Sequence, residues 1–175
     1  YLYLLDYAKV YALGVVKADT EEVMQGFSSM VNGILNGEMS IHRSYMKRLG
    51  VTQEEIKNAK ASLDNISYTH YMLAVSYTGS LADLTVSLLS CMWSYLEIGT
   101  HLSKIPGSTE NEFYGEWIRG YISKEYKELT QWVIDLTDKL ACDMSEKELK
   151  KLEEIFVNTS KYEYMFWDMA YNKGM

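Results

Sequence analysis

Apolar side chains recur every three or four residues along almost the whole chain, and this spacing restricts the fold to packed helices. A single proline, Pro106, occurs in 175 residues, so long helices can run without a break. No segment shows the strict alternation of a half-buried strand. The sequence therefore predicts an all-α protein, and residues 1–175 are enough for one domain with a sizeable core.

Capping residues and glycines mark the expected helix boundaries. The segments 52–55 and 145–148 have the capping-box pattern that opens a helix. Gly50 is expected to end a helix in the left-handed conformation, and Asn36–Gly37 is expected to stop another. Helices are expected at about 1–17, 21–35, 39–49, 65–77, 81–102, 111–121, 124–139 and 145–172, with a short helix or turn after Thr52.

The segment 81–102 is apolar nearly all round, which predicts a central helix buried on every side. The chain opens with Tyr1-Leu-Tyr-Leu-Leu and has no capping residue before this apolar run. We therefore expect the chain to begin inside a helix and to lack its N-terminal segment.

Charge and cysteine usage exclude several classes of function. The net charge of −7 argues against a nucleic-acid partner, because phosphate binding requires a basic face. No apolar run approaches the roughly 20 residues that cross a membrane, so no membrane partner is expected. Cys91 and Cys142 form no Cys-x-x-Cys pair, which predicts reduced thiols in the cytoplasm and not a zinc site.

Cys91 lies on one stripe of the predicted central helix with Ser87 and Tyr95, at a spacing of four residues. A thiol one turn from a phenol can act as a nucleophile with a hydrogen-bonding neighbour. The alternative is that Cys91 packs as a small, inert hydrophobic residue. Spacing alone favours the inert role.

Glu163 lies inside an aromatic segment, Tyr162-Glu163-Tyr164-Met165-Phe166-Trp167. A carboxyl group surrounded by rings has a raised pKa and can serve as a general acid and base. The alternative is that Glu163 points to solvent beside Lys161 or Lys173, and spacing does not decide between the two.

Metal sites receive little support. Glu38 and His42, like Glu97 and His101, are four residues apart, whereas bundle metal sites use Glu-x-x-His spacing. The chain has three histidines, the third being His70, so a metal or a haem is not predicted.

Five segments, in this order, resemble the TenA (thiaminase II) family, and together they span nearly the whole chain. They are Tyr1–Val10, Ser67–Met72, Cys91–Gly99, Glu116–Tyr121 and Ser160–Met169. The resemblance implies a haem-oxygenase-like helical bundle around a buried central helix, assembled as a homotetramer. It also implies a hydrolase that converts 4-amino-5-aminomethyl-2-methylpyrimidine to the 5-hydroxymethyl pyrimidine, and that also cleaves thiamine.

The resemblance also implies roles for individual residues. Cys91 matches the family's nucleophile and Glu163 its acid/base glutamate. Tyr95 matches the tyrosine beside the nucleophile. Tyr3, Tyr68 and Tyr121 match positions that stack on or hydrogen-bond the pyrimidine, and no cofactor is required. The family's substrate-orienting aspartate corresponds to the position before Tyr1, and residues 63–66 depart from the Pro-Thr of many relatives.

Two other functions stay open. A non-catalytic protein that binds a pyrimidine or thiamine would keep the same aromatic pocket. A haem-oxygenase-like metalloprotein would use the histidines.

Overall fold

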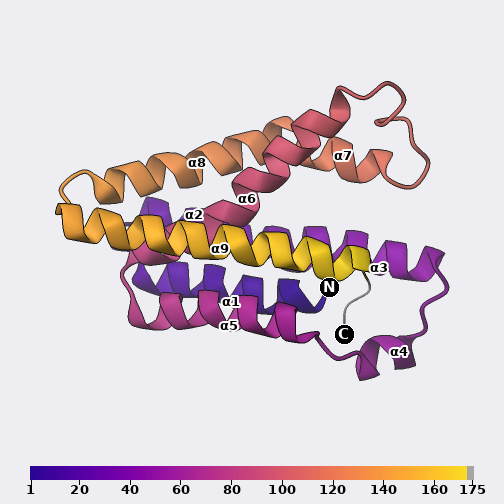
Figure 1. Ribbon diagram of the computed structural model, residues 1–175, viewed down its shortest axis with the longest axis horizontal. Coiled ribbons are helices and arrows are strands. Elements are labelled where there is room, and N and C mark those ends of the chain that lie inside the picture. Colours follow the sequence, from indigo (N-terminus) through magenta and orange to yellow (C-terminus); the bar gives the residue numbers. More distant parts are fainter. Residues whose placement is uncertain (173–175) are drawn as a thin grey trace. The chain divides into compact units, whose positions relative to one another are not determined.

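The computed structural model describes residues 1–172, and every regular element in that range is helical (Figure 1). The all-α prediction is confirmed. The elements are α1 (Leu2–Lys17), α2 (Glu21–Asn32), the π-helix η1 (Gly33–Glu38), α3 (Met39–Arg48), α4 (Gln53–Asn58), α5 (Leu63–Thr78), α6 (Leu81–Ser103), α7 (Gly115–Tyr121), α8 (Lys124–Ala141) and α9 (Glu146–Asn172).

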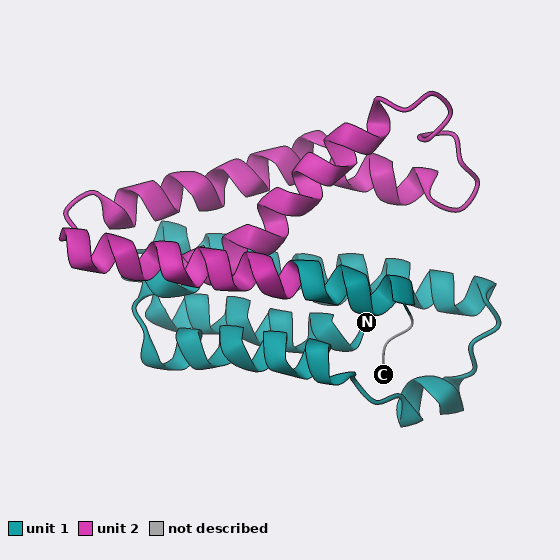
Figure 2. Ribbon diagram, in the orientation of Figure 1, with its two compact units in different colours: residues 1–84, 164–175 teal, residues 85–163 magenta. Residues whose placement is uncertain are grey.

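The chain forms two compact units (Figure 2). Unit 1 holds residues 1–84 and the chain from Tyr164 onward, and unit 2 holds residues 85–163. Helices α6 and α9 each supply residues to both units. The expectation of a single domain that lacks an N-terminal segment stays a prediction.

In unit 1, α1 packs against α2 and α5. The α1–α2 contact is close because Gly14 has no side chain and the buried ring of Phe27 occupies that space. The ammonium group of Lys17 donates a hydrogen bond of 2.7 Å to the carbonyl of Gly79, which ties the end of α1 to the end of α5. The apolar faces of these helices form the core of unit 1, which includes Leu4, Tyr7, Val10, Phe27, Met30, Tyr68 and Met72.

Several predicted helix boundaries are confirmed by hydrogen bonds. Thr52 and Glu55 form the expected capping box at the start of α4. Gly50 has a φ of 75°, as a left-handed helix stop requires. A third box, not predicted from the sequence, opens α6: the Ser80 backbone N–H donates to Asp83 Oδ2 at 2.6 Å.

The predicted helix stop at Asn36–Gly37 is wrong. The chain continues through this dipeptide as the π-helix η1, which joins α2 directly to α3. The Asn36 amide donates to Asn32 Oδ1 one turn earlier, at 2.7 Å, and the Ser40 hydroxyl donates to the Asn36 carbonyl at 2.9 Å. These bonds satisfy Asn36 within a helix, so it does not act as a terminal cap.

Helix α6 confirms the predicted burial only over its first half. Residues 82–90 are all buried, but Trp93, Glu97 and His101 are exposed at successive four-residue steps. The last three turns therefore have one solvent-facing stripe. Among residues 1–172, α6 is the helix whose length and hydropathy would permit a membrane span, and 61% of its most apolar window is buried as in a core helix.

Helix α7 begins at Gly115, later than the predicted residue 111. The Asn111 side-chain oxygen accepts hydrogen bonds from the N–H groups of Phe113 and Tyr114, at 3.0 and 2.8 Å. This Asx turn uses the donors that a helix starting at residue 111 would need, and so it delays the helix.

Candidate active site

Cys91 lies in the middle of α6, in unit 2, and its side chain is half-buried. The Ser94 hydroxyl donates to the Cys91 carbonyl at 3.1 Å, which reinforces this turn of the helix. Tyr95 follows one turn later on the same stripe, as predicted. The thiol is therefore partly accessible and has a phenol as its neighbour on the helix surface.

Tyr95 and Tyr121 come together across the α6–α7 contact, with ring centroids 4.9 Å apart. Trp117, four residues before Tyr121 on α7, packs 4.7 Å from Tyr121 and 5.9 Å from Tyr95. Sequence reasoning missed Trp117 as a site residue, although its i, i+4 spacing to Tyr121 was a signal. Tyr95, Trp117 and Tyr121 thus form a cluster of three aromatic rings, and Cys91 lies one helical turn before Tyr95 on α6.

Gly99 allows α6 to approach Tyr121 closely. A β carbon on Gly99 would lie 3.0 Å from the Tyr121 β carbon, tighter than ordinary van der Waals contact. The absence of a side chain at this position brings the α7 aromatic residues onto the face of α6 that carries Tyr95.

Glu163 is buried on α9, with 5% of its surface exposed. Of the two orientations that the sequence left open for Glu163, the structure shows the buried one. Helix α9 packs near α6 within unit 2, where the rings of Trp93 and Phe156 are 6.3 Å apart. Glu163 lies two turns beyond Phe156 on the same face of α9.

Tyr3 and Tyr68 come together in unit 1, with ring centroids 5.4 Å apart. Tyr68 is completely buried, and the Tyr3 hydroxyl lies 3.9 Å from the sulfur of Met72. Phe166, which was not predicted as a site residue, packs 5.3 Å from Tyr3. The two predicted ligand-binding tyrosines of unit 1 therefore belong to one aromatic cluster.

A cleft of about 390 Å³ opens beside this cluster in unit 1. Tyr3 and Phe166 supply ring surface to it, and the half-buried Ser62 and buried Asn65 supply polar groups. The other lining residues are Tyr1, Leu2, Met46, Val51, Glu55, Ile56, Ala59, Lys60, Ala61 and Met169. Rings with a few polar groups are the usual lining for a planar heterocycle.

No three His, Cys, Asp or Glu side chains gather into a metal-binding group within residues 1–172. The Glu38–His42 pair is present, with 4.0 Å between Oε1 and Nε2. Burial lowers the pKa of His42 to about 4.

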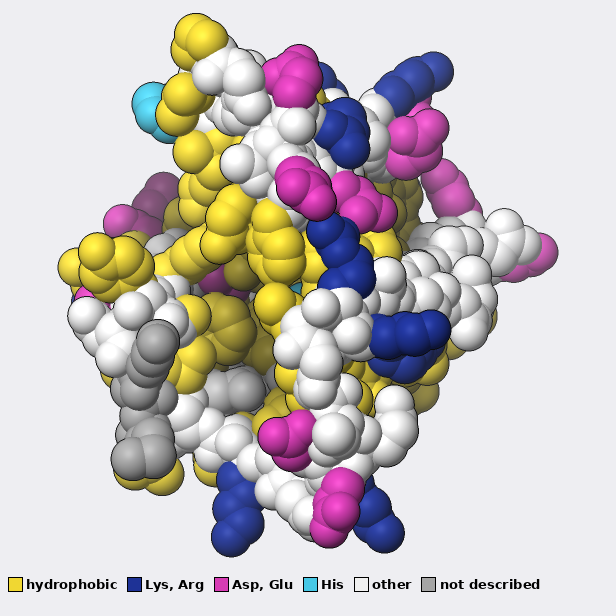
Figure 3. Space-filling model, turned by 90° about the vertical axis from the view of Figure 1, so that its right-hand side faces the viewer, with side chains coloured by type: hydrophobic (Ala, Val, Ile, Leu, Met, Phe, Trp, Pro, Cys, Tyr) yellow, Lys and Arg dark blue, Asp and Glu magenta, His cyan; other side chains and the backbone are white. Residues whose placement is uncertain are grey.

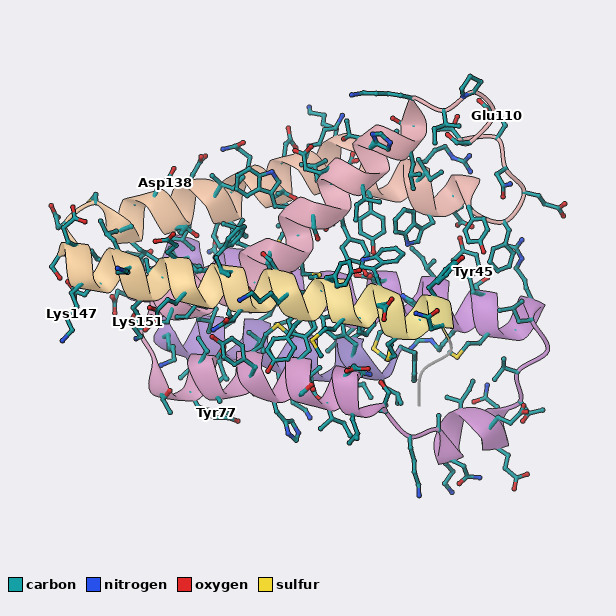
Figure 4. The ribbon with its side chains drawn as sticks, in the orientation of Figure 1. Tyr45, Tyr77, Glu110, Asp138, Lys147 and Lys151 are labelled. Atoms are coloured by element: carbon teal, nitrogen blue, oxygen red, sulfur yellow. The ribbon has the colours of Figure 1, made fainter. Side chains whose placement is uncertain are left out.

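Surface charges of both signs are mixed on the face seen in Figure 3, where basic side chains do not form a continuous patch. Lys147 and Lys151 project outward from the first turns of α9 (Figure 4). All residues from 146 to 154 except Leu152 are exposed, so this part of α9 faces solvent.

Unit 2 contains a thiol one helical turn from an aromatic cluster and also a buried carboxyl group. Unit 1, described by itself, contains a tyrosine cluster with a cleft. A thiol can form a covalent bond to an electron-poor carbon, and a carboxyl group can carry a proton. Aromatic rings provide flat surfaces for a planar ligand.

Known proteins are similar to this chain along nearly its whole length. The model of the TENA/THI-4/PQQC family matches residues 1–173. An aminopyrimidine aminohydrolase from Helicobacter pylori is 54% identical over 171 residues, which cover 98% of this chain and 79% of that protein. An aminopyrimidine aminohydrolase from Halalkalibacterium halodurans is 49% identical over 175 residues, which cover 100% of this chain and 78% of that protein.

Solved structures of similar fold also exist. A TenA family transcription regulator from Silicibacter has a TM-score of 0.87 and 29% identity, over 96% of this chain and 76% of its own. A TenA homologue from P. horikoshii has a TM-score of 0.84 and 27% identity, over 97% of this chain and 78% of its own.

Proposed function

The chain belongs to the TENA/THI-4/PQQC family, and we propose that it is an aminopyrimidine aminohydrolase that acts in thiamine salvage. The observation that carries the proposal is that both of the curated relatives described above, at about half identity over nearly the whole chain, bear that name. The substrate is then a small pyrimidine with an aminomethyl group. The net reaction adds water and releases ammonia, and it needs no redox partner.

Cys91 is the proposed nucleophile, and its half-buried position beside Tyr95 supports this role. The Cys91 thiolate adds to the electron-poor pyrimidine ring, and the electron pair displaced through the ring breaks the exocyclic carbon–nitrogen bond. Water then adds to the resulting exocyclic carbon, and the sulfur leaves the ring as thiolate. The products are the hydroxymethyl pyrimidine and ammonia.

Glu163 is the proposed acid and base. It gives a proton to the departing amine and takes one from the attacking water, so its protonation state is restored at the end of each turnover. The burial of Glu163 supports this role, because bulk water does not compete with the substrate for contact with a buried carboxyl group.

The tyrosines are the proposed binding residues for the pyrimidine ring. In unit 2, Tyr95 and Tyr121 offer ring faces one helical turn from Cys91. In unit 1, Tyr3 lines the cleft, and the buried ring of Tyr68 packs against it and holds its orientation. Such rings stack on a planar heterocycle, and their hydroxyl groups can bond the ring nitrogens and the amino group. Thiamine carries the same pyrimidine, and we propose it as a second substrate that is cleaved to its pyrimidine and thiazole.

We further propose a homotetramer in the cytoplasm. Helix α9 carries an exposed stripe of large aromatic residues at steps of three and four, Tyr164, Trp167 and Tyr171, with exposures of 73%, 40% and 87%. Aromatic residues are enriched where subunits meet, so this stripe suits a contact with a second copy. A reducing compartment suits Cys91 and Cys142, which are not joined in a disulfide.

The direct test is release of ammonia from the aminomethyl pyrimidine by the purified protein. Turnover with formation of the hydroxymethyl pyrimidine supports the hydrolase. Binding of the pyrimidine without turnover would instead favour the alternative, a non-catalytic binding protein. Addition of a metal chelator checks the metalloprotein alternative, since loss of activity on chelation would contradict the proposed chemistry.

A further inference from the structure

We propose that Tyr126 is a positioning residue that holds both the ring of Tyr121 and the turn of α6 that follows Cys91. The inference rests on the proposed function, because it concerns the same aromatic surface and the same thiol. Tyr126 lies on the first turn of α8, outside the five segments that resemble the TenA family.

The hydroxyl group of Tyr126 donates a hydrogen bond of 3.1 Å to the carbonyl of Met92. Met92 directly follows Cys91 and is 3% exposed, so this bond is made to the buried side of the α6 backbone. A carbonyl inside a helix uses one lone pair in the helix and can accept a second donor with the other. Tyr126 thus links α8 to the backbone one residue from the thiol.

The ring of Tyr126 also meets the ring of Tyr121 edge-on, with centroids 4.9 Å apart and an angle of 86° between the planes. Tyr121 additionally contacts Tyr95 and Trp117. Edge-to-face contacts place the positive edge of one ring against the negative face of another, so they favour a defined orientation. With three aromatic neighbours, Tyr121 presents its remaining surface to a ligand in one orientation.

Tyr126 is itself held firmly. Its backbone N–H donates to the Ser123 hydroxyl, the N-cap of α8, at 3.1 Å, and its carbonyl accepts from the Thr130 hydroxyl at 2.9 Å. The backbone of a residue on a capped first helical turn has little conformational freedom. Tyr126 can therefore fix where Tyr121 and the turn of α6 after Cys91 lie relative to α8.

Two substitutions separate the two contacts. Tyr126→Phe keeps the ring against Tyr121 and removes the bond to Met92, so it should lower kcat about fivefold with little change in KM, the size expected for one hydrogen bond. Tyr126→Leu also removes the ring contact, so it should raise KM in addition. Tyr114→Phe and Tyr114→Leu are the matched controls, because Tyr114 lies in the same unit with 63% of its surface exposed.

The experiment measures kcat and KM for ammonia release, the dissociation constant of the hydroxymethyl pyrimidine by calorimetry, and thermal unfolding. The proposal is supported if the kinetic changes occur in Tyr126→Phe without a matching loss of thermal stability. It is overturned if both Tyr126 variants match the Tyr114 controls while the wild type is active. An inactive wild type instead contradicts the proposed function. In that case the positioning role is tested by binding alone, and it is overturned if Tyr126→Leu has the same pyrimidine dissociation constant as the wild type.

Discussion

The rings of Tyr95 and Tyr121 lie 4.9 Å apart in unit 2, which joins an α6 side chain to an α7 side chain far along the chain. Cys91 stands one helical turn before Tyr95, so the aromatic surface begins next to the thiol. This relationship places the proposed nucleophile one helical turn from the proposed binding surface, within one structural unit.

Replacing Cys91 with alanine is expected to abolish ammonia release, because no other group of the proposed site can form the bond to the ring. Pyrimidine binding should persist, since the aromatic side chains stay in place. Steady-state assays and calorimetry measure the two properties. Cys142→Ala is the matched control, because Cys142 is exposed and should be dispensable. Retained turnover in Cys91→Ala would show that another residue is the nucleophile.

Replacing Glu163 with glutamine is expected to lower kcat about 10²- to 10⁴-fold, the usual contribution of a positioned acid or base. The amide is nearly isosteric, so the burial at this position should be preserved. Glu153→Gln makes the same change at an exposed position of α9 and should leave kcat unchanged. Equal kcat values for the two variants would remove Glu163 from the mechanism.

Replacing Gly14 with alanine is expected to lower the free energy of unfolding by about 1 to 2 kcal/mol, measured by urea denaturation. The added methyl group would lie within 3.0 Å of the Phe27 ring, which is completely buried and has nowhere to move. The gain in helix propensity offsets part of this loss. Gly120→Ala, which meets no described atom within 4 Å, should not destabilise the protein.

The free energy of unfolding is expected to fall as the pH decreases from about 6.5 to about 4, in part because of His42. Burial lowers the pKa of His42 to about 4 in the folded state, so in this range the unfolded chain binds a proton that the folded chain does not. The His42 side chain is 41% exposed, so solvent screening keeps the change in unfolding free energy below the value that the full pKa shift would give.

Urea denaturation across this pH range measures the effect of His42. His42→Gln should show a flatter pH dependence than the wild type. His101→Gln changes an exposed histidine in the same way and should keep the wild-type slope. Identical slopes for the wild type and His42→Gln would contradict the assignment.

Most of the fold could be predicted from the sequence because helix formation and capping are local. The boxes at 52–55 and 145–148, the stop at Gly50 and the stripe through Ser87, Cys91 and Tyr95 all depend on residues within two or three turns. Two local predictions were wrong, at Asn36–Gly37 and at Asn111. In both places the asparagine side chain makes a hydrogen bond that the rule for a helix boundary does not assume. Asn36 donates to Asn32 within the helix, and Asn111 accepts from the N–H of Tyr114 in a turn.

Only some features of the candidate site could be predicted from the sequence. The sequence by itself indicated which helices form and which side chains share a face, because a helical period of 3.6 residues can be read without knowing any partner. Only the tertiary structure decided that Glu163 is buried, that Trp117 and Tyr126 contact Tyr121, and that Gly99 lets Tyr121 approach α6 closely. Those facts depend on which helices meet and at what distance, and packing between segments far apart in the chain decides them.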